Sequence, residues 1–257
     1  MLSWSINLFR IRGIQLSLHV SFLLLLAYFG FEGYADGGVP AMLWSMFLLL
    51  AFFACVVLHE LGHSFTGRRF GVNVRRILLM PIGGMAQFDS IPREPWHEFL
   101  MTIAGPAVNF AIVAVLWFPV SFPASWDPAA SPTSLADLGR WLLIGNLYMG
   151  VFNLLPAFPM DGGRILRAFL ATRLPYVRAT FWAATVGKAL AIAGMVVGLW
   201  LGHYLWVILF GFIFLAGEGE YRAIRRQEWI EEQWRSVAAR FPYTTPTTPN
   251  EPPLLER

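Results

Sequence analysis

Charged residues are scarce in this sequence of 257 residues. They make up 14% of the chain, whereas a soluble globular domain carries about 25%. Hydrophobic residues reach 56%, and the mean hydropathy is +0.55. This shortage of charge excludes an ordinary soluble domain and indicates a membrane protein.

Cysteine and lysine are each present once. Cys55 has no second cysteine to pair with, so an internal disulfide is excluded, and its apolar surroundings indicate packing and not a ligand or nucleophile. Lys188 is the only lysine, so arginine supplies nearly all of the basic residues behind the net charge of +3. No nucleic-acid-binding motif accompanies the arginines. The sequence also does not indicate a signal peptide, because no small-residue cleavage site follows the first arginines. We therefore expect no nucleic-acid partner.

Apolar stretches of spanning length dominate the rest of the chain. They predict an all-α membrane protein with about six transmembrane helices, over residues 16–34, 41–66, 97–118, 136–155, 179–201 and 203–219. Residues 1–15 alternate apolar and polar side chains, and Val72 to Phe88 is rich in β-branched and aliphatic residues but too short and interrupted to span. These two segments predict a small membrane-associated β region.

The sequence predicts one membrane domain and a tail. Residues 1–222 form the domain, which includes a short amphipathic helix from Ile165 to Leu174. Residues 223–257 form a cytoplasmic tail that begins as a helix and ends in a disordered segment, because residues 242–253 are rich in Thr and Pro.

The arginines are distributed unevenly between the two sides of the predicted membrane. One side carries Arg140 alone, and the other carries Arg10, Arg12, Arg68, Arg69, Arg75, Arg76, Arg93, Arg164, Arg167, Arg173, Arg178, Arg222, Arg225 and Arg226. Because positive residues favour the cytoplasmic side, we expect a multi-pass protein of the cell membrane with both termini in the cytoplasm.

A His-Glu-x-x-His pattern ends the second predicted span. His59 and His63 are four residues apart, so on a helix both imidazoles leave the same face and can bind one metal ion. Glu60 lies beside them and can accept a proton from metal-bound water. Two histidines packed near a membrane interface are the simpler alternative.

A catalytic zinc site usually has three protein ligands and one open position. Asp161 is the best third ligand, because it follows a span broken by Pro156 and Pro159 at the same predicted side of the membrane as the histidines. The alternative is that Asp161 caps the helix that follows it. The two roles are compatible on two carboxylate oxygens.

Three motifs resemble those of the site-2 protease family, the intramembrane zinc metalloproteases of peptidase family M50. They are H-E-L-G-H at the end of a span, A-G-P-A-V-N from Ala104 to Asn109, and N-L-L-P-A-F-P-M-D-G-G-R from Asn153 to Arg164. The last motif and the six-span plan are similar to the sporulation-protease-like branch. We expect neither the CBS domains of many members of that branch nor the PDZ domain of another.

The resemblance implies roles for the residues that match these motifs. His59, His63 and Asp161 would bind one Zn²⁺ per chain, and Glu60 would be the general base. Asn153 would donate to the developing oxyanion; its alternative is a hydrogen bond between helices. Asn109 is expected only to support helix packing, with Gly105 and Pro106 allowing close approach of two backbones.

The resemblance also implies a membrane-protein substrate with a transmembrane segment, cut near the cytoplasmic face by regulated intramembrane proteolysis. An anti-sigma or pro-sigma factor is one possible substrate, and the lipid bilayer is the other partner. The region from Val72 to Phe88 is the expected substrate-binding edge, because an opened peptide can add there as a strand. The alternatives are a catalytically silent pseudoprotease that binds membrane clients and a metal transporter, although a transporter would have ligands along a path across the bilayer.

Overall fold

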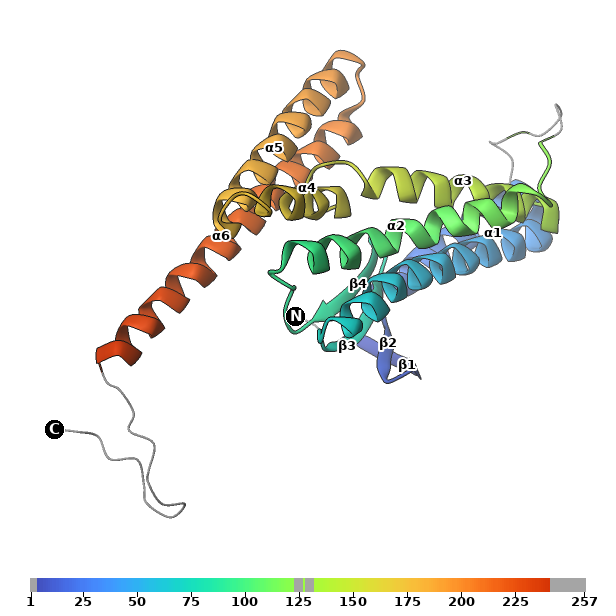
Figure 1. Ribbon diagram of the computed structural model, residues 1–257. Coiled ribbons are helices and arrows are strands. Elements are labelled where there is room, and N and C mark those ends of the chain that lie inside the picture. The colour runs from blue at the N-terminus through green and yellow to red at the C-terminus, as the bar shows by residue number, and fades with distance from the viewer. Residues whose placement is uncertain (1–3, 123–126, 128–131, 241–257) are drawn as a thin grey trace. The chain divides into compact units, whose positions relative to one another are not determined.

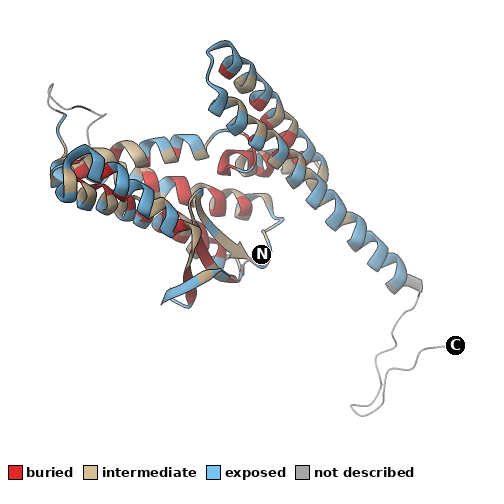
Figure 2. Cartoon of the chain, turned by 180° about the vertical axis from the view of Figure 1, so that it is seen from behind, coloured by how far each residue is buried: buried red, intermediate tan, exposed pale blue. Residues whose placement is uncertain are grey.

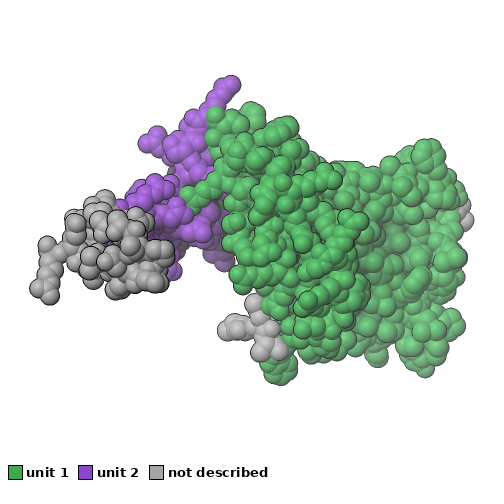
Figure 3. Space-filling view, turned by 60° about the horizontal axis from the view of Figure 1, so that its bottom comes forward, with its two compact units in different colours: residues 1–156, 160–172 green, residues 157–159, 173–257 purple. Residues whose placement is uncertain are grey.

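The computed structural model describes residues 4–122, 127 and 132–240. Within these residues the chain forms six helices and four strands, so the predicted helical class with a small β region is confirmed (Figure 1). The chain divides into two compact units, residues 1–156 with 160–172 and residues 157–159 with 173–257 (Figure 3).

The first long helix, α1, runs from Ser21 to Arg69 and contains the first two predicted spans. Gly37 and Gly38 have non-helical backbone angles, and Gly38 has a φ of 68°, which a residue without a Cβ adopts without strain. They break α1 into two helical segments between the first two predicted spans. The first segment starts later than predicted, because residues up to His19 belong to a strand.

The sheet is larger than the sequence indicated and has the strand order β1-β2-β3-β4. The predicted N-terminal strand is an antiparallel hairpin, formed by β1 (Ser5–Ile11) and β2 (Ile14–His19). A second hairpin, formed by β3 (Val74–Met80) and β4 (Gly83–Phe88), pairs with it through parallel strands β2 and β3. This β2–β3 pairing requires a long crossover, and α1 supplies it.

Apolar side chains hold the sheet against α1. Alternate residues of β2 and β3 point to one face, and that face packs on the second segment of α1 in a core formed by Ile14, Leu16, Val74, Ile77, Leu79, Phe53, Val56, Val57 and Leu61. The end of α1 that carries the histidines is therefore fixed to the sheet by buried apolar surface.

Three more helices complete the first unit: α2 (Pro95–Trp117), α3 (Leu135–Asn153) and α4 (Asp161–Ala171). Proline is the first residue of α2, and the side chain of Ser134 caps α3 by accepting from the backbone of Asp137. Helix α4 corresponds to the predicted short amphipathic helix but starts at Asp161 and not at Ile165.

The second unit is a helical hairpin of α5 (Tyr176–Trp200) and α6 (Tyr204–Arg240). Helix α6 continues without a break from the sixth predicted span into the predicted tail helix. The predicted disordered segment, residues 242–253, lies outside the described residues.

Three of the described helices, α1, α2 and α5, are long and apolar enough to cross a membrane. Helix α1 has 49 residues, about twice the length that one span requires. Many helix residues are exposed (Figure 2). The large apolar residues that are exposed include Leu24, Phe118, Trp200 and Leu205. Surface of this kind needs a lipid environment or a partner, so the membrane class is confirmed.

Candidate metal centre

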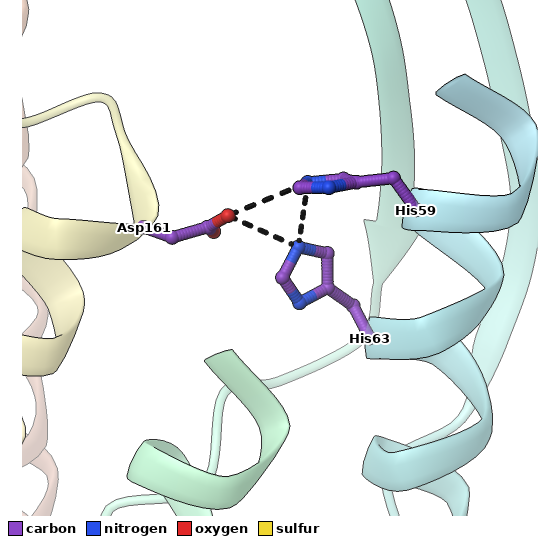
Figure 4. A group of neighbouring side chains, drawn as sticks. All are labelled: His59, His63 and Asp161. Carbon is purple, nitrogen blue, oxygen red and sulfur yellow. Dashed lines mark hydrogen bonds and ion pairs between the residues drawn. The ribbon is translucent and has the colours of Figure 1, made fainter. Parts of the chain in front are cut away.

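The structure brings His59, His63 and Asp161 together (Figure 4). The two Nε2 atoms of the histidines are 3.1 Å apart, and Oδ2 of Asp161 lies 3.4 Å from Nε2 of His59 and 3.3 Å from that of His63. All three residues belong to the first unit and are buried. Residues about 100 positions apart in sequence therefore present their ligand atoms to one point.

The alternative that Asp161 caps α4 is wrong. Met160 occupies the N-cap position and no side chain caps the helix, while Asp161 is its first residue. The Asp161 carboxylate is directed toward the histidines. Its Oδ2 atom is buried and makes no hydrogen bond, so it is available to a metal ion.

The ring nitrogens on the other side of the imidazoles are occupied. His63 Nδ1 lies 2.9 Å from the carbonyl oxygen of Met101, and His59 Nδ1 lies 2.6 Å from Oδ1 of Asn109. A carbonyl oxygen only accepts, so each Nδ1 carries the hydrogen and each Nε2 presents a lone pair. Two lone pairs and a carboxylate thus converge in a buried space, an arrangement that a bound cation stabilises.

The donor set fits zinc. Two neutral imidazoles and one carboxylate are the ligands of one common class of catalytic zinc site, which leaves a further position for water. The sequence prediction of the donor set therefore agrees with the geometry.

Close backbone contacts position these ligands. A Cβ atom on Gly62 of α1 would lie 2.7 Å from the carbonyl oxygen of Ala104 in α2, so the two helices touch backbone to backbone beside the histidines. A Cβ on Gly105 would overlap the His63 ring and lie 2.8 Å from Cε1 of His59. Gly162 likewise lets α4 begin directly against the backbone carbonyl groups of Leu154 and Leu155, which follow α3. Each of these glycines is required by steric exclusion.

Glu60 faces the sheet edge. Its Oε2 atom accepts a hydrogen bond of 3.2 Å from the backbone N–H of Ala86 in β4. A Cβ on Gly84 would lie 2.8 Å from Cγ of Glu60, so this glycine admits the carboxylate side chain to the strand. Strand β4 is the edge of the sheet, and the glutamate adjoining His59 lies against it.

Asn153 and Lys188 each have a partner within their own unit. The Asn153 side chain donates to the carbonyl oxygen of Met149 in its own helix, 3.0 Å away. Lys188 pairs with Glu218 at 2.9 Å within the α5–α6 hairpin, which gives it a structural partner. Asn109 has the opposite outcome: sequence analysis assigned it only to packing, yet it contacts His59. Its place in the A-G-P-A-V-N motif was the available signal.

Comparison with known proteins decides the family. A model described as peptidase family M50 matches residues 47–130 and 119–194, which include both histidines and Asp161. The chain is a member of peptidase family M50. The family resemblance seen in the three motifs is thereby confirmed.

Relatives and a solved structure agree with this membership. The chain is 37% identical to a zinc metalloprotease of Methanocaldococcus jannaschii over 93% of its own length and 66% of the relative. It is 30% identical to a putative zinc metalloprotease, Rip3, of Mycobacterium tuberculosis, over 98% of this chain and 68% of that protein. The site-2 protease structure from Methanocaldococcus jannaschii matches with a TM-score of 0.57 and 37% identity, over 85% of this chain and 95% of that one.

The sporulation branch is also represented. Stage IV sporulation protein FB of Bacillus subtilis is 30% identical over 51% of this chain and 43% of its own length. The chain spans about two thirds of the length of the first two relatives. The region matched by the family model includes the His59, His63 and Asp161 group, which could hold a metal ion.

Proposed function

We propose that this protein is an intramembrane zinc metalloendopeptidase that cleaves a transmembrane protein near the cytoplasmic face by regulated intramembrane proteolysis. One observation carries the proposal: His59, His63 and Asp161 converge, and the helix α1 that carries both histidines and Glu60 is apolar enough for a bilayer. The intact Glu60 disfavours a catalytically silent client-binding protein, and the clustering of the ligands at one point disfavours a transport path.

The metal ligands and the base have separate tasks. His59, His63 and Asp161 would hold zinc, which when bound lowers the pKa of water and polarises a carbonyl oxygen. Glu60 would accept the proton of the attacking water on its carboxylate and deliver it to the nitrogen of the departing amine. The Ala86 N–H would orient this carboxylate before the reaction.

Asn153 is proposed as the donor to the developing oxyanion. Its Nδ2 atom now bonds Met149 O, a contact within one turn of α3 that a rotation of the side chain would release. The role depends on such a rotation in the substrate complex.

Strand β4 is proposed to bind the opened substrate segment. A transmembrane helix satisfies its own peptide groups, so the substrate must unwind before its carbonyl groups can react. Within the region from Val72 to Phe88, β4 is the edge strand and Glu60 lies against its outer side. A substrate strand added there would run past the proposed base.

A cavity beside the site supports an apolar substrate. Its volume is about 830 Å³, it adjoins Gly162, and its lining includes Trp96, Phe99, Ile165 and Phe169 from α2 and α4. Such a lining accommodates hydrophobic side chains of a membrane segment.

We further propose the complete membrane arrangement. Residues 1–222 would form the metalloprotease domain with six spans, residues 223–257 a cytoplasmic tail, and both termini would lie in the cytoplasm of a multi-pass cell-membrane protein. The partners are the bilayer and a single-span substrate, for which an anti-sigma or pro-sigma factor is a candidate.

Cleavage by paired variants tests this function. Purified wild type and Glu60→Ala would be incubated, in liposomes, with tagged anti-sigma and pro-sigma factors that have one span. Wild type should release a fragment in a reaction that phenanthroline stops, and Glu60→Ala should release none while keeping its zinc. Equal cleavage by both proteins would contradict the proposal.

A further inference from the structure

Two buried asparagines link His59 to the backbone of another helix. Oδ1 of Asn109 lies 2.6 Å from His59 Nδ1, and Nδ2 of Asn109 donates to Oδ1 of Asn146 over 2.9 Å. Nδ2 of Asn146 in turn donates to the carbonyl oxygen of Leu142 over 2.8 Å. Neither asparagine is exposed. The series begins at a metal ligand on α1 and ends on the main chain of α3.

The last acceptor determines the orientation of every group before it. The carbonyl oxygen of Leu142 can only accept, so Asn146 must present its NH₂ group there and its oxygen to Asn109. Asn109 must then present NH₂ to Asn146 and oxygen to His59. That oxygen accepts from Nδ1–H, which leaves the Nε2 lone pair of His59 directed at His63 and Asp161.

Reversing the side-chain amide of either asparagine would place two donors or two acceptors opposite each other. Turning either asparagine by 180° places two NH₂ groups or two oxygens against each other, which leaves buried polar atoms without partners. Met149 supports the observed direction, because its sulfur, a weak acceptor, lies 3.5 Å from Asn109 Nδ2.

Association of two helices alone would require fewer hydrogen bonds than this series contains. Two asparagines can hold neighbouring membrane helices together through one mutual hydrogen bond. Here each asparagine also uses the second polar group of its amide. Oδ1 of Asn109 contacts a ring nitrogen of His59, and Nδ2 of Asn146 donates to the carbonyl oxygen of Leu142, which can only accept. Metal-binding histidines depend on such partners for their ring orientation and tautomer.

We propose that Asn146, acting through Asn109, is a positioning residue that holds His59 in the tautomer competent to bind metal. This inference rests on the proposed zinc site and not on the proposed substrate. It assigns a role to a residue outside the three family motifs.

Variants separate orientation from packing. Asn109→Asp keeps an acceptor for His59 Nδ1, whereas Asn109→Leu removes it at similar size. Asn146→Leu removes the connection to Leu142 without touching His59. Thr180→Val is the matched control, since Thr180 is also fully buried and hydrogen-bonded to a helix carbonyl, but lies in α5.

Zinc affinity, measured by competition with a chromophoric chelator, is the first readout. Loss of such an indirect partner lowers metal affinity about 10–100-fold, so we expect Asn109→Leu to fall in this range and Asn146→Leu near its lower end. Thr180→Val should stay within about 3-fold of wild type, and Asn109→Asp, which keeps the acceptor for His59 but loses the donor to Asn146, should lose less affinity than Asn109→Leu. Equal losses in Asn109→Asp and Asn109→Leu would overturn the proposal.

The ¹⁵N spectrum of histidine-labelled, metal-free protein is the second readout. At alkaline pH, His59 should show a protonated Nδ1 and an unprotonated Nε2 in wild type and in Thr180→Val. In folded Asn146→Leu protein the two tautomers should mix. An unchanged His59 spectrum in that variant would overturn the proposal even if the protein cleaves no substrate, and neither readout depends on proteolysis.

Discussion

Arg167 of α4 and Glu98 of α2 form an ion pair in which neither side chain has exposed surface. Nε and Nη2 of Arg167 lie 2.8 Å and 2.5 Å from Oε1 of Glu98. The pair joins the helix that begins with Asp161 to the helix that contacts both histidines. Glu98, Met101, Gly105 and Asn109 are all buried residues of α2. This helix supplies no ligand, yet it positions all three.

Breaking this ion pair should weaken both the fold and the metal site. Glu98→Gln leaves a buried guanidinium without its counter-charge, which costs about 3–5 kcal/mol in the free energy of unfolding. Because α4 carries Asp161, zinc affinity should fall as well. Denaturant unfolding in detergent and chelator competition measure the two effects. The double variant Glu98→Leu with Arg167→Met should recover stability, and an unaltered Glu98→Gln protein would contradict this account.

Gly105→Ala should abolish metal binding. The added methyl group would occupy the space of the His63 imidazole, so the ring must move from its ligand position. We expect zinc affinity to fall by more than about 100-fold, beyond the range for indirect partners. Gly217→Ala is the control, since its Cβ would meet no atom closer than 3.8 Å. Zinc retained by Gly105→Ala at wild-type affinity would refute the steric argument.

The outer edge of β4 can be tested at Ala86. Because the N–H of Ala86 points to Glu60, alternation along the strand directs the N–H of Met85 to β3. Proline at Met85 would damage the sheet, whereas Ala86→Pro removes an edge donor. Loss of one such hydrogen bond should lower kcat/KM about 10-fold, with zinc content unchanged. Ala86→Gly keeps the N–H and should cleave as wild type does. A fully active Ala86→Pro enzyme would contradict a role for this N–H in the reaction, whether it orients Glu60 or a substrate strand.

Lys188 should be dispensable for chemistry. Its partner Glu218 also binds Arg222, with Nε and Oε1 2.7 Å apart, so Lys188→Met leaves the carboxylate paired. For this solvent-screened pair we expect little change in the free energy of unfolding. Cleavage rate and zinc content should match wild type. A large fall in rate with full zinc content would instead assign Lys188 a catalytic role.

Local sequence patterns selected the three side chains that converge in the structure. The spacing of His59 and His63 lies within one helix. The prolines before Asp161 interrupt the preceding helix regardless of how that helix packs against the others. Both signals depend only on residues that are close in sequence, so they can be recognised without knowledge of the tertiary structure.

Interactions between distant helices were not predictable in the same way. No local pattern indicates that Glu98 meets Arg167 or that Asn146 meets Asn109, because each pairing depends on how α2 crosses α3 and α4. The N-terminal hairpin was also missed, because a single alternating segment does not reveal where the chain turns. The turn lies at Arg12 and Gly13, which both have positive φ angles.

X-ray absorption at the zinc edge of the metal-loaded protein tests the central claim most directly. We predict one zinc per chain with two imidazole nitrogens at about 2.0–2.1 Å and oxygen ligands at about 2.0–2.2 Å. Asp161→Ala should change the oxygen shell and leave the imidazole signal. A spectrum without two imidazoles, or one identical in Asp161→Ala, would contradict the assignment of His59, His63 and Asp161 as the metal centre.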